Sequence, residues 1–223
     1  MISIIVPTLN EEDSLAECLK NLRKIIRDND EIIVVDGQSE DKTVAIAATS
    51  SVKVVHSSRG RGAQMNAGAE AARNSILWFL HSDCLPRKEC RLEIANAVRQ
   101  NFDWGFFDIQ FSNMNWKYRV LETCMNARSR ISQIATGDKG IFCRKELFIA
   151  VGGFPKIEIM EDLELSKRLR KYKLICVESR IIASARKWES EGFIRTIVLM
   201  WFLRFCWFIG FPSSLLHSYY YKN

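Results

Sequence analysis

Short apolar segments and helix-periodic segments alternate along the first half of the chain. The apolar segments are rich in β-branched or aromatic residues and end in polar clusters, as strands do: 2–7, 31–36, 52–56 and 76–81. In the first connection, apolar positions recur at helical spacing and predict one buried helix face: Leu15, Leu19, Leu22 and Ile26. This alternation predicts an α/β fold with a Rossmann-like, mostly parallel sheet and helices on both faces.

The expected helices have recognisable first residues. Asn10 is the predicted N-cap of the first helix, with Glu11 and other acids in its electropositive first turn. A second helix is expected to begin near Ser39, and a third covers about 63–73. The carboxyl ends of the parallel strands should meet along one edge of the sheet, where open α/β sheets bind their ligands.

The pattern is less regular after about residue 100. A weak alternation over Trp104–Phe111 predicts an antiparallel edge strand. The other expected elements are a helix over 116–131, a strand over 136–143, a helix over 161–171 and short strands over 173–177 and 181–185. No repeat or low-complexity linker interrupts the chain, so we expect a single domain over 1–223.

Residues 193–211 are almost purely apolar and aromatic, with Arg195 and Arg204 as the charged exceptions. Nine positions at about 100° each place these arginines on opposite sides of a helix, which therefore has no clean amphipathic face. A transmembrane span is disfavoured, because Arg204 near its centre adds about 2.5–3.5 kcal/mol on insertion scales. We expect an apolar C-terminal helix packed on the core or on a second copy, with a membrane surface as the main alternative.

Composition and charge narrow the class of protein only slightly. Lys and Arg outnumber Asp and Glu by 32 to 26, and the net charge of +6 suits an anionic substrate, an acidic membrane surface or nucleic acid equally well. The seven cysteines include no CxxC pair, which argues against a zinc ribbon or a disulfide framework. The opening apolar run stops at Pro7 without a basic leader, so we expect a cytoplasmic protein, with peripheral contact at the inner face of the membrane left open.

Polar residues follow the second and third expected strands. Asp36 can accept hydrogen bonds from a nucleotide base or from ribose hydroxyls, although a plain turn explains it equally well. Arg59 and Arg61 stand with two glycines ahead of a helix, an arrangement that suits a diphosphate. The segment is neither a dinucleotide fingerprint, because Met65 replaces the third glycine, nor a P-loop.

Acidic residues follow the fourth strand and begin a later helix. In His81-Ser82-Asp83, the carboxylate could hold Mg²⁺ or Mn²⁺ beside diphosphate oxygens, while a hydrogen-bonded structural histidine is the more common role for His81. Asp162, next to Glu161 at a helix start, could act as a general base or could simply complement the helix dipole.

Arg186-Lys187-Trp188 follows the last expected strand. These residues offer cations for phosphate and an indole for stacking, although a basic surface turn would have the same composition.

Five segments, in this order, resemble family 2 glycosyltransferases of the GT-A type over nearly the whole chain: SIIVPTLNEE, VVDGQSEDKT, RGRGAQMNAG, LHSD and MEDLELSKRL. The resemblance implies the GT-A (nucleotide-diphospho-sugar transferase) fold and inverting transfer of a sugar from a nucleoside diphosphate sugar to an acceptor hydroxyl. It implies Asp83 as the ligand of Mg²⁺ or Mn²⁺ and Asp162 as the general base. The residues expected to bind the donor are Pro7, Thr8, Glu11, Asp36, Arg59, Gly62, Asn66, Ser82, Asp83, Arg186 and Trp188.

The resemblance also divides the chain and shows two departures. Residues 1–99 would bind the nucleotide-sugar, 100–190 would hold the acceptor and the base, and 191–223 would form the apolar helical segment. His81 replaces the first acid of the Asp-x-Asp motif, which puts the metal in doubt, and the late Gln-x-x-Arg-Trp motif is altered, which argues against processive synthesis. The length and the LHSD segment further resemble a small bacterial subgroup associated with arsenosugar biosynthesis.

Two other functions remain as alternatives at this stage. A nucleotidyltransferase would also bind a nucleotide on an α/β sheet but would release pyrophosphate. A non-catalytic nucleotide-binding protein is the second, and no nucleic acid partner is expected, because the aromatics gather in the C-terminal segment instead of among the cations. The acceptor is expected to be a small molecule or a lipid-linked hydroxyl, and 193–211 would contact a membrane surface or a second copy.

Overall fold

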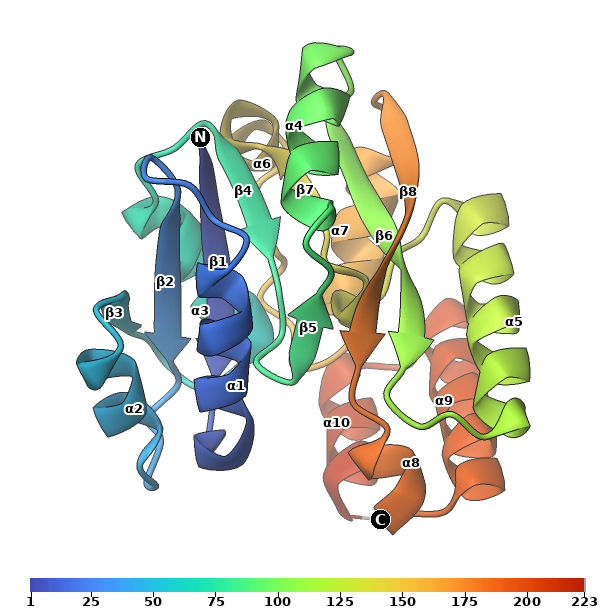
Figure 1. The fold of residues 1–223 in the computed structure, drawn as a ribbon. Coiled ribbons are helices and arrows are strands. Elements are labelled where there is room, and N and C mark those ends of the chain that lie inside the picture. The colour runs from blue at the N-terminus through green and yellow to red at the C-terminus, as the bar shows by residue number, and fades with distance from the viewer. Residues whose placement is uncertain (223) are drawn as a thin grey trace.

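The computed structural model describes residues 1–222 and shows one eight-stranded sheet in the order β3-β2-β1-β4-β7-β6-β8-β5 (Figure 1). The strands are β1 (Ile2–Thr8), β2 (Glu31–Asp36), β3 (Lys53–His56), β4 (Ile76–Phe79), β5 (Cys84–Pro86), β6 (Trp104–Phe111), β7 (Phe142–Arg144) and β8 (Leu174–Ala183). The first four strands run parallel to one another, as the sequence predicts. β7 runs antiparallel to β4 and β6, and β5 antiparallel to β8, while β6 and β8 are parallel.

Helices cover both faces of this sheet. The helices are α1 (Glu12–Arg23), α2 (Thr43–Thr49), α3 (Arg61–Ala71), α4 (Cys90–Arg99), α5 (Trp116–Ser132), α6 (Lys145–Ala150), α7 (Glu161–Leu169), α8 (Arg186–Ser190), α9 (Phe193–Phe208) and α10 (Ser213–Lys222), with a 3₁₀ turn η1 (Gly137–Lys139) before β7. Two buried clusters lie on the two sides of the sheet: α1, α2, α4 and α5 contribute to one, and α3, α6 and α7 to the other. The predicted α/β architecture is therefore confirmed.

Three expectations for the second half of the chain were wrong in detail. β6 is an interior strand between β7 and β8, not an edge, and Phe106 and Phe107 on it have no exposed surface. The two short strands expected over 173–177 and 181–185 are one continuous strand, β8, which pairs with β6 across a bulge at Phe107/Asp108. Pairing with distant segments decided these points, and local periodicity does not report it.

The strand expected over 136–143 is also shorter than predicted. Its first part forms the 3₁₀ turn η1, and only its end joins β7. Gly140, at a φ of +57°, separates the two, because a left-handed residue ends the turn there. The chain thereby brings η1 up to the carboxyl end of β4 instead of adding a longer strand.

The loops after β1 and β2 are joined by reciprocal hydrogen bonds. Asn10 is not the N-cap of α1; its side-chain oxygen accepts the Glu40 N–H, while its own N–H donates to Ser39 Oγ. The Glu11 N–H donates to Thr43 Oγ1, and the Glu12 N–H donates to Asp41. Asp41 thus caps the first turn of α1, and the bonds in both directions hold the ends of β1 and β2 together.

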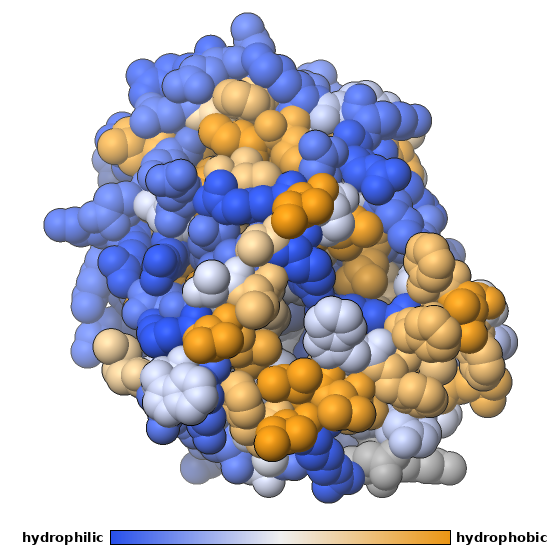
Figure 2. Space-filling model, turned by 90° about the vertical axis from the view of Figure 1, so that its right-hand side faces the viewer, coloured by the Kyte–Doolittle hydropathy of each residue, from blue (hydrophilic) through white to orange (hydrophobic). Residues whose placement is uncertain are grey.

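The C-terminal segment forms two helices, α9 and α10, that pack against each other at the lower end of the molecule in Figure 1. Leu199, Leu203 and Cys206 of α9 bury one face against Met160 and Leu216 in a third cluster. Among residues 1–222, no helix has both the length and the apolar character needed to cross a bilayer. Figure 2, which views the molecule from the right-hand side of Figure 1, shows hydrophobic side chains gathered over its lower part.

Candidate active site

The predicted site residues lie along the carboxyl edge of the parallel strands. β1 ends at Thr8 and β2 at Asp36, which are paired in the strand register, and β4 leads directly into His81-Ser82-Asp83. Since β1 separates β2 from β4, the strands that lead to Asp36 and to this tripeptide are about 10 Å apart, two spacings of ~4.8 Å. The edge is therefore wide enough to hold an extended ligand such as a nucleotide.

Asp36 is buried and rigidly held at the end of β2. Its carboxylate accepts the N–H groups of Gln38 and Ser39 at 3.0–3.2 Å, and it lies 3.6 Å from His56 Nδ1. Gln64 of α3 donates from Nε2 to the carbonyls of Thr8 and Val35 at 2.7 and 2.9 Å. These contacts show that the Asp36 loop has a fixed shape before any ligand binds.

Pro7 and Thr8 end β1 as buried residues, and Thr8 Oγ1 donates to the Val35 carbonyl at 3.3 Å. Glu11, just beyond, accepts a hydrogen bond from Ser14 Oγ and lies 3.7 Å from Arg186 of α8. The first and last parts of the predicted donor site are thus joined by an ion pair.

Trp188, on α8 with Arg186, packs edge-on against Phe111, and its ring centroid lies 6.1 Å from that of Phe193. Its contacts are with the hydrophobic core, whereas Arg186 is exposed next to Glu11. Of the two donor-binding residues predicted on α8, the structure brings Arg186 to the site edge and turns Trp188 toward the core.

Arg59, just before α3, and Arg61, its first residue, have different neighbours. Arg59 pairs with the exposed Glu40 at 2.6 Å and donates to the Gln38 carbonyl at 3.4 Å, next to the Asp36 loop. Arg61 instead lies close enough to act on His81 and Glu161: its charge adds to the lowering of the pKa of His81 by burial, and it partly offsets the rise that burial causes in the pKa of Glu161. Arg61 is therefore a cation near the acidic part of the site, and Arg128, on which the charges of Asp138 and Asp162 act, is another.

Gly62 and Asn66 of α3 hold the loop that precedes α7. A Cβ at Gly62 would lie 2.9 Å from the Pro155 carbonyl oxygen. The Asn66 amide donates to the Phe154 carbonyl and accepts the Phe154 N–H, each at 2.9 Å. In this structure both residues position the polypeptide that leads to Glu161, a role that their place in the sequence did not indicate.

Asp162 is held by two backbone N–H groups. Its Oδ2 accepts the Gly137 N–H and its Oδ1 accepts the Leu163 N–H, each at 2.7 Å. Burial and the neighbouring Glu161 carboxylate raise the pKa of Asp162 to about 7 despite these hydrogen bonds. A carboxylate with a pKa near neutrality is suited to accept a proton from a substrate hydroxyl.

His81 lies on the other side of Gly137. A Cβ at Gly137 would be 2.5 Å from His81 Nε2, so the ring is packed directly on this glycine. Burial, with the Arg61 charge as a smaller cause, lowers the pKa of His81 to about 3, which keeps the imidazole neutral. Gly137 therefore contacts His81 through its Cα and Asp162 through its N–H, and it connects the β4 end to α7.

Asp138 belongs to the same acidic group, although the sequence analysis did not select it. Its negative charge raises the pKa of Asp162 and of Cys84, the residue after Asp83. Thr136 and Asp138 flank Gly137 on the 3₁₀ turn, in a segment predicted as a strand. If the sequence had indicated a 3₁₀ turn instead of a strand at this point, Asp138 could have been assigned to the site.

The residues after β4 fit a divalent ion only in part. Asp83 offers a carboxylate whose Oδ1 accepts a weak contact from Cys84 Sγ at 3.6 Å, while Ser82 is buried. His81 Nε2 is closed off from solvent against Gly137, so it is not open to a metal ion here. Within residues 1–222, no group of three or more His, Cys, Asp or Glu side chains is arranged to hold a metal ion. An ion at Asp83 would depend on diphosphate and water oxygens for its other ligands.

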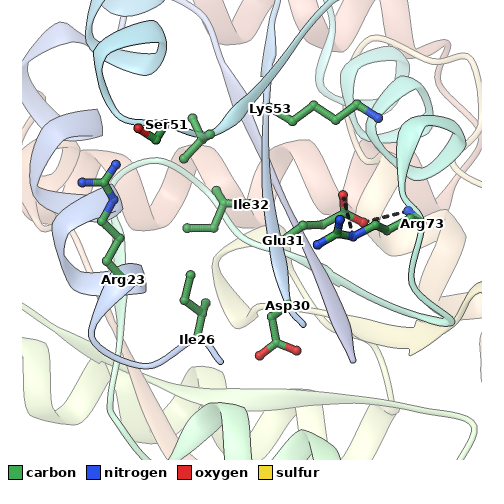
Figure 3. A pocket seen from close by; sticks show the side chains of 9 residues that line it. Arg23, Ile26, Asp30, Glu31, Ile32, Ser51, Lys53 and Arg73 are labelled. Carbon is green, nitrogen blue, oxygen red and sulfur yellow. Dashed lines mark hydrogen bonds and ion pairs between the residues drawn. The ribbon is translucent and has the colours of Figure 1, made fainter. Parts of the chain in front are cut away.

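The opposite edge of the sheet carries a separate hollow of about 440 Å³, shown in Figure 3. It lies at the amino ends of β2 and β3 and is lined by residues that include Arg23, Glu31, Lys53 and Arg73. Arg73 donates its N–H to Glu31 at 2.7 Å and also pairs with that carboxylate through its guanidinium, as the dashed lines show. This hollow contains none of the predicted site residues.

The sequence of residues 3–154 matches the glycosyl transferase family 2 domain. The chain belongs to this family. Among family relatives, the PGL/p-HBAD biosynthesis glycosyltransferase of Mycobacterium bovis is 25% identical over 92% of this chain and 83% of its own. EpsH of Bacillus subtilis is 38% identical over 37% of this chain, and the match spans 26% of EpsH. An uncharacterized glycosyltransferase of Haemophilus influenzae is 25% identical over 76% of this chain and 62% of its own length.

Solved structures show the same fold for this family 2 protein. S. aureus TarS superposes with a TM-score of 0.70 at 21% identity, covering 82% of this chain and 60% of that one. The mannosyltransferase PcManGT from Pyrobaculum calidifontis, solved with GDP-Man and Mn²⁺, has a TM-score of 0.66 at 20% identity and covers 100% of this chain and 64% of its own. The GT-A fold expected from the sequence is confirmed, and the arsenosugar subgroup stays a prediction.

Proposed function

We propose that this protein transfers a sugar, with inversion, from a nucleoside diphosphate sugar to an acceptor hydroxyl, and that Asp162 is the general base. The observation that carries the proposal is the state of Asp162: it is fixed by two N–H groups, and its pKa is raised to about 7. Asp162 takes the proton of the acceptor hydroxyl while that oxygen attacks the anomeric carbon. The bond from that carbon to the diphosphate breaks, and the nucleoside diphosphate leaves.

The donor is proposed to lie along the carboxyl edge. The nucleoside would contact the ends of β1 and β2 and the diphosphate would reach α3, where Arg61 is near His81. The residues that make up this proposed donor site are Pro7, Thr8, Glu11, Asp36, Arg59, Gly62, Asn66, Ser82, Asp83, Arg186 and Trp188. The Asp36 loop supports the proposal because it is held in shape without a ligand. A site that is ordered in advance loses less entropy on binding.

Asp83 is the residue proposed to hold Mg²⁺ or Mn²⁺. When bound, the ion would neutralise charge on the leaving diphosphate. The structure of glucosyl-3-phosphoglycerate synthase from Mycobacterium tuberculosis, a fold relative with a TM-score of 0.61, contains Mn²⁺ and UDP. Arg61 would add positive charge from the protein itself, next to the buried neutral His81. The acceptor would be a small molecule or a lipid-linked hydroxyl.

The base is tested by the Asp162→Asn substitution, which keeps the shape and removes the proton acceptor. We expect turnover to fall by about 10²–10⁴-fold, the usual contribution of a positioned base, while nucleoside diphosphate binding persists. Glu164→Gln is the matched control, because Glu164 lies on the same helix and pairs with Lys167 and Arg168. Near-normal turnover of the Asp162 variant would refute the role.

The reaction class is tested by product analysis with a panel of nucleoside diphosphate sugars and Mn²⁺. A glycosyltransferase releases nucleoside diphosphate. A nucleotidyltransferase, the other enzyme considered, consumes a nucleoside triphosphate and releases pyrophosphate. If nucleotides raise the melting temperature but no sugar donor or nucleoside triphosphate is consumed, a non-catalytic nucleotide-binding role gains support; a ligand at 100 times its Kd adds about 2.7 kcal/mol of stability.

A further inference from the structure

α9 exposes a continuous apolar face on the side opposite its buried face. Thr196, Leu199, Leu203 and Cys206 are buried, while Ile194, Trp201 and Phe205 are 74%, 68% and 62% exposed. Soluble proteins seldom leave large apolar side chains together in this way, so such a surface normally contacts a partner or a membrane. The buried face of α9 is satisfied by the third cluster, so this exposed face is a separate feature.

The apolar surface is broader than one helix. Leu215 and Tyr219 of α10 are also exposed, and the Tyr219 ring lies 5.6 Å from that of Phe202. A shallow groove of about 470 Å³ is lined by Ile197, Val198, Trp201, Phe202 and Phe205. In Figure 2 the hydrophobic colour gathers in the same lower region where Figure 1 places α9 and α10.

The two arginines of α9 flank this exposed face. At 100° per residue, Arg195 and Arg204 are about 180° apart around the helix, and the face centred on Val198 and Phe205 lies between them. This arrangement puts one cation at each border of the apolar surface. Long cationic side chains at such borders can reach lipid headgroups while the apolar face enters the acyl boundary.

We propose that α9, supported by α10, docks this protein in the plane of an anionic lipid bilayer surface. α9 has 16 residues, about 24 Å, and lies along the molecular surface, which suits a helix in the headgroup region. Residues 193–222 contain no Asp or Glu, so negative lipid headgroups meet arginines and no acid of this segment. Trp201 and Tyr219 add aromatic side chains of the kind enriched at membrane interfaces.

A second copy of the chain fits this surface less well. In a two-fold dimer the face would meet itself, and the borders carrying Arg195 and Arg204 would bring cations next to cations. Repulsion between like charges opposes such a contact. An anionic bilayer satisfies both the apolar face and its basic borders.

The helix that carries the docking surface packs, through its opposite face, on the segment that carries the proposed catalytic base. Met160 and Leu163, on either side of Asp162, pack in the cluster that buries α9, and Lys167 of α7 lies over the Trp207 ring. α8 joins the same region to Glu11 through Arg186. A bilayer on α9 would therefore lie about one helix diameter, ~10–12 Å, from the segment that carries Asp162, and the acceptor would be a membrane lipid hydroxyl. This consequence rests on the proposed function; the docking itself does not.

The docking is tested by flotation with two kinds of vesicle. One contains phosphatidylcholine alone, and the other contains phosphatidylcholine with ~30 mol% of the anionic lipid phosphatidylglycerol. We expect the full chain to float with the anionic vesicles. Val198→Asp/Phe205→Asp should lower the bound fraction at least tenfold, and Arg195→Gln/Arg204→Gln should reduce the preference for anionic lipid. Ile131→Asp, at an 85% exposed position on α5, is the matched control and should bind like the original chain.

The possible results distinguish a lipid bilayer from a second copy of the chain as the partner of the exposed α9 face. Equal flotation of the Asp variants and the original chain would overturn the proposal, as would absence of binding by the original chain to either vesicle. A dimer in light scattering that Phe205→Asp abolishes, without vesicle binding, would assign the face to a second copy and also overturn it. Unchanged circular dichroism checks the fold, with Phe208→Asp, at 83% exposure, as a second variant. Nucleoside diphosphate binding, measured without vesicles, reports on the proposed function separately.

Discussion

At the residue scale, the site depends on a few atoms around Gly137. Its N–H holds Asp162, and its lack of a side chain leaves room for the His81 ring. A neutral imidazole and a carboxylate of raised pKa are thereby kept on either side of one backbone unit. Both groups are buried enough that small displacements would alter their protonation.

The pKa of Asp162 predicts the pH dependence of turnover. The base is protonated below about pH 7, so kcat should rise about tenfold per pH unit below that value and level off above it. A divalent ion nearby would favour the carboxylate and move this limb to lower pH. A pH profile of turnover, measured with and without added Mn²⁺, checks both statements. A turnover that stays constant between about pH 5 and 8 would contradict them.

The raised pKa of Asp162 also affects stability: turnover should rise with pH, whereas the contribution of this group to the free energy of unfolding should fall with pH. The folded pKa of Asp162 is above its ordinary value of 3.8, so the folded state binds more protons than the unfolded state between about pH 4 and 7. The contribution of this group is therefore present at low pH and is lost as pH rises through 7. Urea unfolding of the original chain and of Asp162→Asn across this range isolates it.

Gly137→Ala tests the contact between the glycine and His81. The added methyl group would overlap His81 Nε2, so the ring or the 3₁₀ turn must shift and Asp162 with it. We expect turnover to fall at least about tenfold, which corresponds to ~1.4 kcal/mol of transition-state stabilisation. If the effect acts through the ring, the loss caused by Gly137→Ala will be smaller in a His81→Ala background. Additive losses would show that the ring is not involved.

At the scale of the elements, α3 positions the segment that carries the base. Asn66 makes two hydrogen bonds to the backbone of Phe154, and Gly62 allows Pro155 to approach the helix. Glu161 and Asp162 follow directly on α7, with Met160 at a φ of +70° before them. The loop between α6 and α7 is thus part of the site architecture.

Asn66→Ala should loosen that loop. The Phe154 N–H and carbonyl would lose their partners in a part-buried position, which we expect to lower the free energy of unfolding by about 1–3 kcal/mol. Asn96→Ala on α4, whose amide pairs with Arg99 on the surface, should change it by less than about 0.5 kcal/mol. Urea titrations compare the two variants, and equal effects would argue against a special role of Asn66.

At the scale of the whole molecule, the two ends of the strands differ in chemistry. The carboxyl edge gathers Asp83, Asp138 and Asp162 beside Arg61, while the amino edge holds a hollow whose charged side chains include the Glu31–Arg73 pair. α9 packs through its buried face and the third cluster on the segment that carries Asp162, while its exposed apolar face lies on the opposite side of the helix. The proposed membrane surface therefore lies one helix diameter, ~10–12 Å, from the segment that carries the proposed base, and transfer to a membrane lipid requires such proximity.

The sequence alone determined the parallel half of the sheet and the place of its acids. The patterns that predict strands (alternating or continuous apolar residues) and helices (a period of 3.6) depend on neighbouring residues alone. The bounds of β1, β2 and α1, including the end of β2 at Asp36, were therefore predicted within a few residues. The resemblance of the motifs added the proposed role of Asp162 as the base, which no spacing could supply.

Only the tertiary structure decided which distant segments meet. The interior position of β6, the cross-capping by Asn10 and Asp41, and the meeting of Gly137 with His81 and Asp162 all join residues far apart in the chain. Local propensity carries no information about such partners, because their free energy arises from pairing and burial after the chain has closed. The exposed face of α9 likewise became visible once the third cluster had selected which side of an apolar helix to bury.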